Sequence, residues 1–117
     1  MSTIPNPNQD PSPIRITARC PIRTTLELIG GKWKLLIIHQ LQNGPHRFSE
    51  LKRLIPEISD KMLTHELAIL TESGLVSRKE HKSSAPFVEY SLDKRGELVK
   101  PVIDEMVNFA QGYLKQG

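Results

Sequence analysis

Apolar residues recur at helical spacing in four segments between about residue 22 and residue 73. Glycine or proline follows each segment, which predicts that each is a separate helix. The four predicted helices cover about residues 22–29, 32–42, 48–55 and 59–73, with Ser59 as the N-cap of the fourth. The residues predicted to face inward are Ile22, Leu26 and Ile29 in the first helix, Trp33, Leu36, Ile37 and Leu41 in the second, Phe48, Leu51, Leu54 and Ile55 in the third, and Leu63, Leu67 and Leu70 in the fourth.

A different pattern follows Gly74, which is expected to close the fourth helix as a C′ glycine. Two short half-buried segments, at 75–81 and 87–92, surround a polar tip and predict a β-hairpin. Asp93 is expected to cap one last helix that runs to about residue 115 and bends at Pro101. One stripe of this helix carries Leu98, Val102, Met106, Phe109 and Tyr113.

Length and composition place these elements in one small domain. The chain has 117 residues, of which 38% are hydrophobic and 25% are charged, as is typical of a soluble domain with a modest core. The first 18 residues hold four prolines among Asn, Gln and Ser, which favours a mobile tail. We therefore predict a flexible tail at 1–18 and one folded domain of the α+β class at 19–117.

Cysteine content, hydropathy and charge narrow the setting further. Cys20 is the single cysteine, so no disulfide can form within the chain. The sequence has no 18-residue apolar run and no signal-peptide pattern, so we expect a cytoplasmic protein without a membrane partner. The formal net charge of +3 and the pI near 9.2 suit a partner that carries phosphates, although simple solubility would explain the same excess.

The order of the elements predicts a winged helix-turn-helix. The third helix, the turn that contains Pro56 and the fourth helix form the helix-turn-helix, whose second helix can enter the major groove of DNA. The outer face of that helix carries short polar and charged groups that can contact base edges and phosphates. An ordinary amphipathic surface helix is the alternative. The candidate base-reading residues are Ser59, Asp60, Lys61, Thr64 and His65, beside Ala68.

Basic residues on the hairpin and around the other helices are candidate contacts to the DNA backbone. A basic hairpin tip would follow the phosphates or enter a minor groove, whereas a solvated turn is the alternative. Each remaining candidate could equally be an ordinary surface charge. The candidates are Arg78, Lys79, His81 and Lys82 on the hairpin, Arg47, Lys52 and Arg53 around the third helix, and Lys32 and Lys34 at the start of the second.

Five ordered sequence blocks resemble the HxlR-type winged-helix regulators. The blocks are residues 20–21 with 28–37, 47–51, 58–64, 74–76 and 88–92, and the resemblance extends from residue 20 to about 115. It implies a three-helix core, a β-hairpin wing and a long C-terminal dimerisation helix. It also implies a sequence-specific DNA-binding transcriptional regulator, most often a repressor, that acts as a homodimer.

In that family the first and last helices build a two-fold dimer. The resemblance therefore implies that the stripe of Leu98, Val102, Met106, Phe109 and Tyr113 partly faces a second copy of the chain. Two fourth helices about 34 Å apart would then occupy successive major grooves of a pseudo-palindromic site.

The chain departs from the family pattern at the wing and on the fourth helix. Phe87 stands where a basic wing residue is common, and Asp60 and His65 stand where glutamines are common. Asp60 would repel a phosphate, accept a hydrogen bond from a cytosine amine, or support the N-terminus of its own helix. We favour helix support.

Cys20 raises the question of regulation. Some members of the family sense electrophiles or oxidants through a cysteine at the start of the first helix, and Cys20 occupies the matching position. A helix N-terminus and the neighbouring Arg19 and Arg23 would favour the reactive thiolate. Oxidation would give a sulfenic acid, a small-thiol adduct or a bridge to the partner subunit. A small buried hydrophobic residue is the alternative.

Enzyme and metal functions find no support in the sequence. The four histidines do not stand at metal-ligand spacing with Cys20, and no nucleophile elbow or phosphate-binding glycine loop is present. We expect no enzyme activity, no metal and no cofactor. The competing function is a winged-helix module that binds protein or RNA. The polar outer face of the fourth helix favours nucleic acid over protein.

Overall fold

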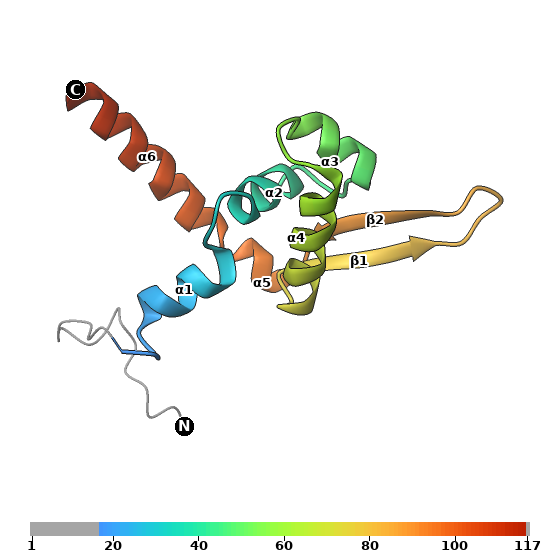
Figure 1. Ribbon diagram of the computed structural model, residues 1–117, viewed down its shortest axis with the longest axis horizontal. Coiled ribbons are helices and arrows are strands. Elements are labelled where there is room, and N and C mark those ends of the chain that lie inside the picture. Colours follow the sequence, from blue (N-terminus) through green and yellow to red (C-terminus); the bar gives the residue numbers. More distant parts are fainter. Residues whose placement is uncertain (1–16, 117) are drawn as a thin grey trace. The chain divides into compact units, whose positions relative to one another are not determined.

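The computed structural model describes residues 17–116 (Figure 1). These residues fall into two compact units, one ending at Gly30 and the other beginning at Gly31. Most of the predicted tail at 1–18 lies outside the described residues.

The first unit contains one helix, α1 (Pro21–Ile29). Pro21 is its first residue, where the missing N–H of proline costs nothing. The helix ends where the Gly30 N–H donates to the Leu26 carbonyl at 2.8 Å. Ile29 is buried, but Ile22 and Leu26 are exposed, so two of the three side chains predicted to face inward do not.

The second unit is a winged helix, as the sequence predicts. In Figure 1 its first three helices gather into a core, while the hairpin and the last helix extend from opposite sides of that core. Its elements are α2 (Lys34–Leu41), α3 (Phe48–Leu54), α4 (Asp60–Glu72), β1 (Val76–His81), β2 (Phe87–Leu92), α5 (Lys94–Glu97) and α6 (Lys100–Gln116).

The core of this unit is aliphatic and comes from every helix of the helix-turn-helix. Its buried apolar residues are Ile37, Ile38 and Leu41 from α2, Leu51 from α3, Ile55 and Ile58 from the turn, Leu63, Leu67 and Leu70 from α4, Leu75 and Val76 at the start of the wing, and Val99 and Ile103 around the start of α6. Leu36 and Leu54, which the sequence predicts to face inward, are exposed. Four apolar residues stand in succession at 35–38, so periodicity alone could not select the inward face of α2.

Both ends of α4 form as the sequence predicts. The Ser59 hydroxyl accepts a hydrogen bond from the Met62 N–H at 3.0 Å, which satisfies one free donor of the first turn. At the other end, Gly74 adopts a φ of 83°. The Leu75 N–H then donates to the Leu70 carbonyl at 3.1 Å, and the Gly74 N–H donates to the Thr71 carbonyl at the same distance. These are the two bonds of a Schellman motif.

The wing is an antiparallel hairpin in which Val76 pairs with Leu92 and His81 pairs with Phe87. A third segment joins it at a single residue, His46. The His46 N–H donates to the Tyr90 carbonyl at 2.9 Å, and the Tyr90 N–H donates back at 2.8 Å. This bridge attaches the chain just before α3 to the wing, and no pattern in the sequence predicts it.

The prediction of one last helix bent at Pro101 is wrong. The chain forms the short helix α5, a turn at Leu98 and Val99, and then α6, in which Pro101 is the second residue. Proline has no N–H to donate to the carbonyl four residues earlier, which here belongs to Glu97. Pro101 therefore begins a helix, and Leu98 caps α5 and does not lie on α6.

Candidate nucleic-acid interface

The five predicted base-reading residues are all exposed, and they occupy one side of α4 and its N-cap. They are Ser59, Asp60, Lys61, Thr64 and His65. On the opposite side Leu63, Leu67 and Leu70 are almost completely buried. The helix therefore presents polar groups outward because its leucines hold the reverse side in the core.

Thr64 already uses part of its hydrogen-bonding capacity within the helix. Its hydroxyl donates to the Asp60 carbonyl at 2.8 Å. The hydroxyl oxygen can still accept, which suits the amino groups of adenine or cytosine in the major groove.

The turn before α4 is closed by Lys52. Its ammonium group donates to the Ile58 carbonyl and lies 3.3 Å from a carboxylate oxygen of Asp60. These contacts direct Lys52, a candidate phosphate contact from the sequence, toward the protein's own turn. They also pair the negative charge of Asp60 at the first residue of α4, which favours the helix-support interpretation.

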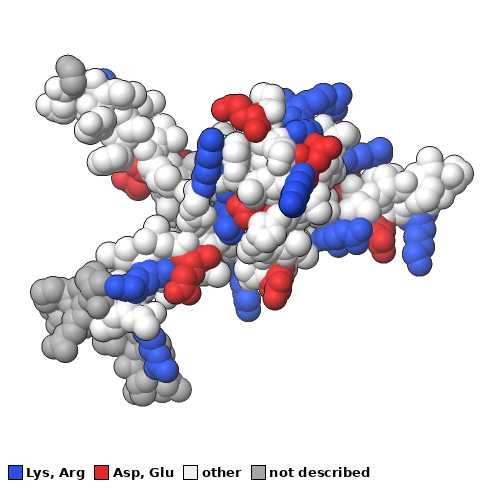
Figure 2. Space-filling model, in the orientation of Figure 1, with Lys and Arg blue, Asp and Glu red and all other residues white. Residues whose placement is uncertain are grey.

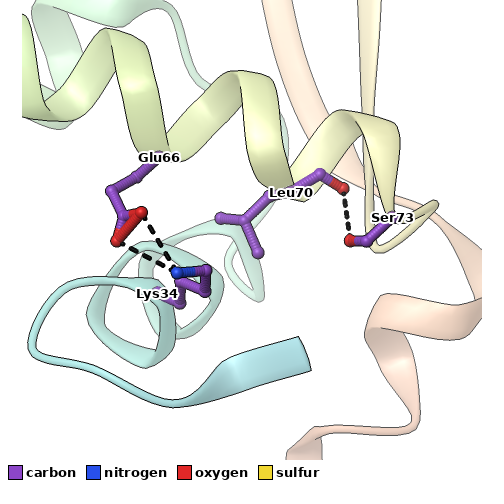
Figure 3. Close-up of polar contacts among 4 residues, drawn as sticks. All are labelled: Lys34, Glu66, Leu70 and Ser73. Carbon is purple, nitrogen blue, oxygen red and sulfur yellow. Dashed lines mark hydrogen bonds and ion pairs between the residues drawn. The ribbon is translucent and has the colours of Figure 1, made fainter. Parts of the chain in front are cut away.

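A second lysine candidate points into the protein. Lys34 Nζ lies 3.1 Å and 3.4 Å from the two carboxylate oxygens of Glu66 (Figure 3). Only 14% of the Lys34 side chain is exposed. The expectation that Lys34 contacts phosphate is therefore wrong for this structure, because a buried carboxylate on α4 holds its charge.

Phe87 links the wing to the helix-turn-helix. The guanidinium carbon of Arg47, the N-cap residue of α3, lies 3.8 Å from the centre of the Phe87 ring. The His81 ring stacks on the same phenyl group at 4.5 Å, and His81 Nε2 lies 2.8 Å from Glu89 Oε1. Arg47 and His81, both predicted as DNA contacts, thus each pack on the residue that departs from the family pattern.

Four other basic candidates are exposed at the surface. They are Arg53 on α3, Lys61 on α4, and Lys79 and Lys82 on the wing. In residues 17–116 no ion pair involves any of these four side chains. Figure 2 shows Lys and Arg side chains over α3 and along the hairpin, while most of α6 is uncharged. The second unit therefore carries basic groups on the elements that surround α4.

Three residues on these elements have environments that the sequence did not predict. Met62 is exposed on α4 and offers an apolar contact of the kind that thymine methyl groups make. Phe87 contacts both Arg47 and His81, although its type suggested only the loss of a basic group. Glu66 was not among the residues predicted to be buried, yet it is 6% exposed and pairs with Lys34.

The apolar stripe of α6 is uncovered. Ile103 is the one buried residue of α6. The stripe residues Val102, Met106, Phe109 and Tyr113 are exposed. The exposed fractions of Phe109 and Tyr113 are 73% and 69%, and their ring centres lie 6.2 Å apart. Leu98, at the end of α5, is also exposed. Large apolar side chains gathered on one helix mark a surface for association.

Cys20 belongs to the first unit, at the N-cap position of α1. Its side chain makes no capping hydrogen bond, and the residue is 2% exposed. No cluster of three potential metal ligands occurs in the part of the chain that the structure describes. Among the same residues, no helix combines the length and the apolar character needed to cross a bilayer.

Comparison with known families decides the identity of this fold. The profile described as HxlR-like helix-turn-helix matches residues 28–117. The chain belongs to the HxlR-like helix-turn-helix family. The match covers the whole second unit, including the helix-turn-helix, the wing and α6.

Individual proteins that are similar to this chain are also described as regulators. The HTH-type transcriptional regulator YkvN of Bacillus subtilis (strain 168) is 48% identical over 97 residues, which span 83% of this chain and 82% of YkvN. The crystal structure of the HTH-type regulator YtcD matches with a TM-score of 0.78 at 38% identity, over 81% of this chain and 97% of that one. The redox regulator HypR in its oxidised form matches with a TM-score of 0.75 at 36% identity, over 80% and 96%. This HxlR-like chain is a helix-turn-helix transcriptional regulator, and not an enzyme.

Proposed function

We propose that this HxlR-like regulator binds duplex DNA as a homodimer and represses transcription from the sites it occupies. The observation that carries the proposal is the exposed polar face of α4, which stands opposite a row of buried leucines. In a helix-turn-helix this is the face that enters the major groove.

The chemistry of that face suits base recognition. Thr64 and His65 carry hydrogen-bonding groups of a size that can meet base edges, and Lys61 can contact a guanine or a phosphate. Met62 adds an apolar contact beside them. An apolar face would favour a protein partner, so the polar character of α4 supports DNA over the alternative of a protein-binding module.

The wing supplies contacts that do not depend on sequence. Lys79 and Lys82 are exposed on the hairpin, and Arg47 approaches it from α3 through Phe87. Charges of this kind bind phosphates and displace counterions, which strengthens binding to any duplex.

The dimer rests on α6. A helix of 17 residues with Val102, Met106, Phe109 and Tyr113 exposed has the apolar surface that a second copy would cover. Two α4 helices related by the dimer axis would read the two halves of a pseudo-palindromic site. A dimer bound across a promoter would exclude polymerase, which is why we propose repression.

The proposal is tested by selecting bound fragments from the source genome and titrating the selected operator and a scrambled duplex. We expect Thr64→Ala and His65→Ala to weaken operator binding by about 1–3 kcal/mol each while leaving scrambled binding nearly unchanged. Lys82→Ala should weaken binding to both duplexes alike and reduce the salt dependence. Lys94→Ala, an exposed lysine on α5, is the matched control and should change neither.

Two results would contradict the proposal. One is a wild-type protein that binds the operator and the scrambled duplex equally. The other is an equal loss of both affinities in the Thr64, His65 and Lys82 variants, because α4 would then have no special part in recognition.

We further propose that Cys20 gives this regulator its response to oxidants or electrophiles. Support comes from the similarity to a protein described as a redox regulator and from the position of Cys20 at the start of α1. Since the residue is buried, a reagent reaches the thiol only when this helix start opens. Modification would then leave the start of α1 unable to close again.

Mass spectrometry after mild peroxide or quinone treatment tests the Cys20 proposal, together with operator titration. We expect one adduct at Cys20 and release of the operator by the treated wild type, but no release by Cys20→Ser. A Cys20→Ser variant that still releases the operator after treatment would rule the proposal out, as would a wild-type thiol that stays unmodified.

A further inference from the structure

Glu66 has an unusual position for a charged residue. Among residues 17–116 it is the one charged residue that is buried, with 6% of its surface exposed. It stands in the leucine row of α4, between Leu63 and Leu70. A carboxylate in such a place is costly unless a charged partner and hydrogen bonds compensate it.

Lys34 is that partner, and it comes from a different helix. Figure 3 shows Glu66 and Leu70 projecting from α4 toward α2, with the Lys34 ammonium group facing the carboxylate. Both carboxylate oxygens lie within 3.4 Å of Lys34 Nζ. Lys34 is the first residue of α2, and Ile37, Ile38 and Leu41 anchor that helix in the core. The ion pair therefore ties the middle of α4 to a fixed point.

Stability alone does not account for this arrangement. Replacing a buried ion pair with apolar residues of similar volume is often neutral or stabilising, so a leucine at 66 would serve the core at least as well. A leucine at position 66 would not fix the rotation of α4 about its axis. Apolar contacts tolerate a small rotation of a helix, whereas a charge-assisted hydrogen bond requires a defined distance and angle.

The side of the helix axis toward which Glu66 points determines where the DNA-facing residues of α4 point. Successive residues of an α-helix lie about 100° apart around its axis, which places Thr64 and Lys61 on the side away from Glu66. Holding the carboxylate against Lys34 therefore holds Thr64 and Lys61 toward the solvent. A rotated α4 would still offer its polar groups to phosphates, but it would misalign them with the base edges.

We propose that the buried Lys34–Glu66 pair sets the rotation of α4 and so serves as a positioning device for sequence discrimination. The inference rests on the proposed DNA binding by α4. It assigns to two residues that do not reach the DNA a part in the choice between DNA sequences.

The test compares the double variant Lys34→Met/Glu66→Leu with the wild type. We expect its melting temperature to equal or exceed that of the wild type, because the apolar pair fills the same space. Its affinity for the scrambled duplex should be unchanged. The ratio of scrambled to operator Kd should fall about tenfold, which is the effect of losing one good base contact.

A single variant and a control pair complete the experiment. Glu66→Gln keeps the shape of the side chain, so it remains informative if the double variant does not fold, and we expect it to lower the same ratio when measured below its melting temperature. The control is Lys100→Met/Asp104→Leu, an exposed ion pair on α6 with a separation of 3.1 Å. It should leave the ratio at the wild-type value.

The outcomes separate this inference from the proposed function. If the wild type prefers the operator and the folded Lys34 and Glu66 variants keep the full preference, the inference is overturned and DNA binding by α4 stands. If the wild type shows no preference between the duplexes, both are overturned. A lowered melting temperature with an unchanged Kd ratio would show a purely structural pair and would also overturn the inference.

Discussion

A Cβ atom at Gly96 would lie 2.2 Å from the Leu75 carbonyl oxygen and 3.0 Å from Leu92 Cδ2. The same carbonyl accepts a hydrogen bond from the Asp93 N–H at 3.0 Å, and the Asp93 carboxylate accepts one from the Ser77 hydroxyl. The backbone of α5 thus packs directly against the start of the wing. Glycine is required here by the close approach of two backbone segments.

We predict that Gly96→Ala lowers the free energy of unfolding by about 1–3 kcal/mol, since the obstructing atoms belong to backbone that must move. Gly112→Ala is the control, because the added methyl group meets no atom within 4 Å beyond its neighbours in the helix backbone, and alanine favours the helix. Thermal unfolding followed by circular dichroism measures both. An unchanged melting temperature for Gly96→Ala would contradict the close approach.

For single residues, the sequence predicts the features that depend only on neighbours in the chain. The Ser59 cap and the Gly74 terminus depend on bonds within five residues, and both form as predicted. The positions of Lys34 and Lys52 depend on partners from other helices or turns, and no local pattern in the sequence indicates those partners. A lysine at a predicted helix surface looks the same whether it faces water or a buried carboxylate.

Among the elements, the wing shows most clearly how one residue connects two parts of the second unit. Phe87 receives Arg47 from the start of α3 and His81 from β1. The His46–Tyr90 bridge joins the same two regions through the backbone. The hairpin is therefore held against the helix-turn-helix by side-chain and backbone contacts together.

We predict that Phe87→Ala loosens the hairpin. The cation–π and stacking contacts together contribute about 1–2 kcal/mol, so amide hydrogens of β1 and β2 should exchange about tenfold faster. Binding to operator and scrambled DNA should weaken to the same extent if, as we propose, the wing contacts phosphates. Ser84→Ala at the exposed tip is the control. Wild-type exchange rates in Phe87→Ala would show that Phe87 does not order the wing.

The sequence predicts helices and strands correctly where the periodic pattern of apolar residues is strong. Both α4 and the hairpin appear where the sequence predicts them, since alternating and helical patterns differ clearly there. The break between α5 and α6 was missed because Pro101 was assigned to the interior of one helix. The one-residue pairing of His46 has no periodic signal at all.

For the whole molecule, the exposed stripe of α6 is the main feature that one chain leaves unexplained. Family membership establishes the winged helix and the regulator class, and the sequence blocks were sufficient to predict both. The dimer that we propose would form through contacts between two copies of α6, and one chain does not contain those contacts.

We predict that the wild type is a dimer in solution and that Phe109→Glu raises the dimer Kd about a hundredfold or more, because it replaces an aromatic anchor with a charge that must be buried. Sedimentation equilibrium measures the change. Gln111→Glu, which adds the same charge to a different side of α6, should remain dimeric. A monomeric wild type, or a dimeric Phe109→Glu, would contradict the role of this helix.

The most direct test of the account is selection of preferred binding sites from a random DNA library by the wild type, Thr64→Ala and Lys82→Ala. We predict that the wild type prefers a pseudo-palindromic sequence. Thr64→Ala should change the preferred base at a symmetric pair of positions, whereas Lys82→Ala should keep the wild-type preference at lower affinity. An identical preferred sequence for the wild type and Thr64→Ala, or no preferred sequence for the wild type, would contradict the claim that the outer face of α4 recognises DNA bases.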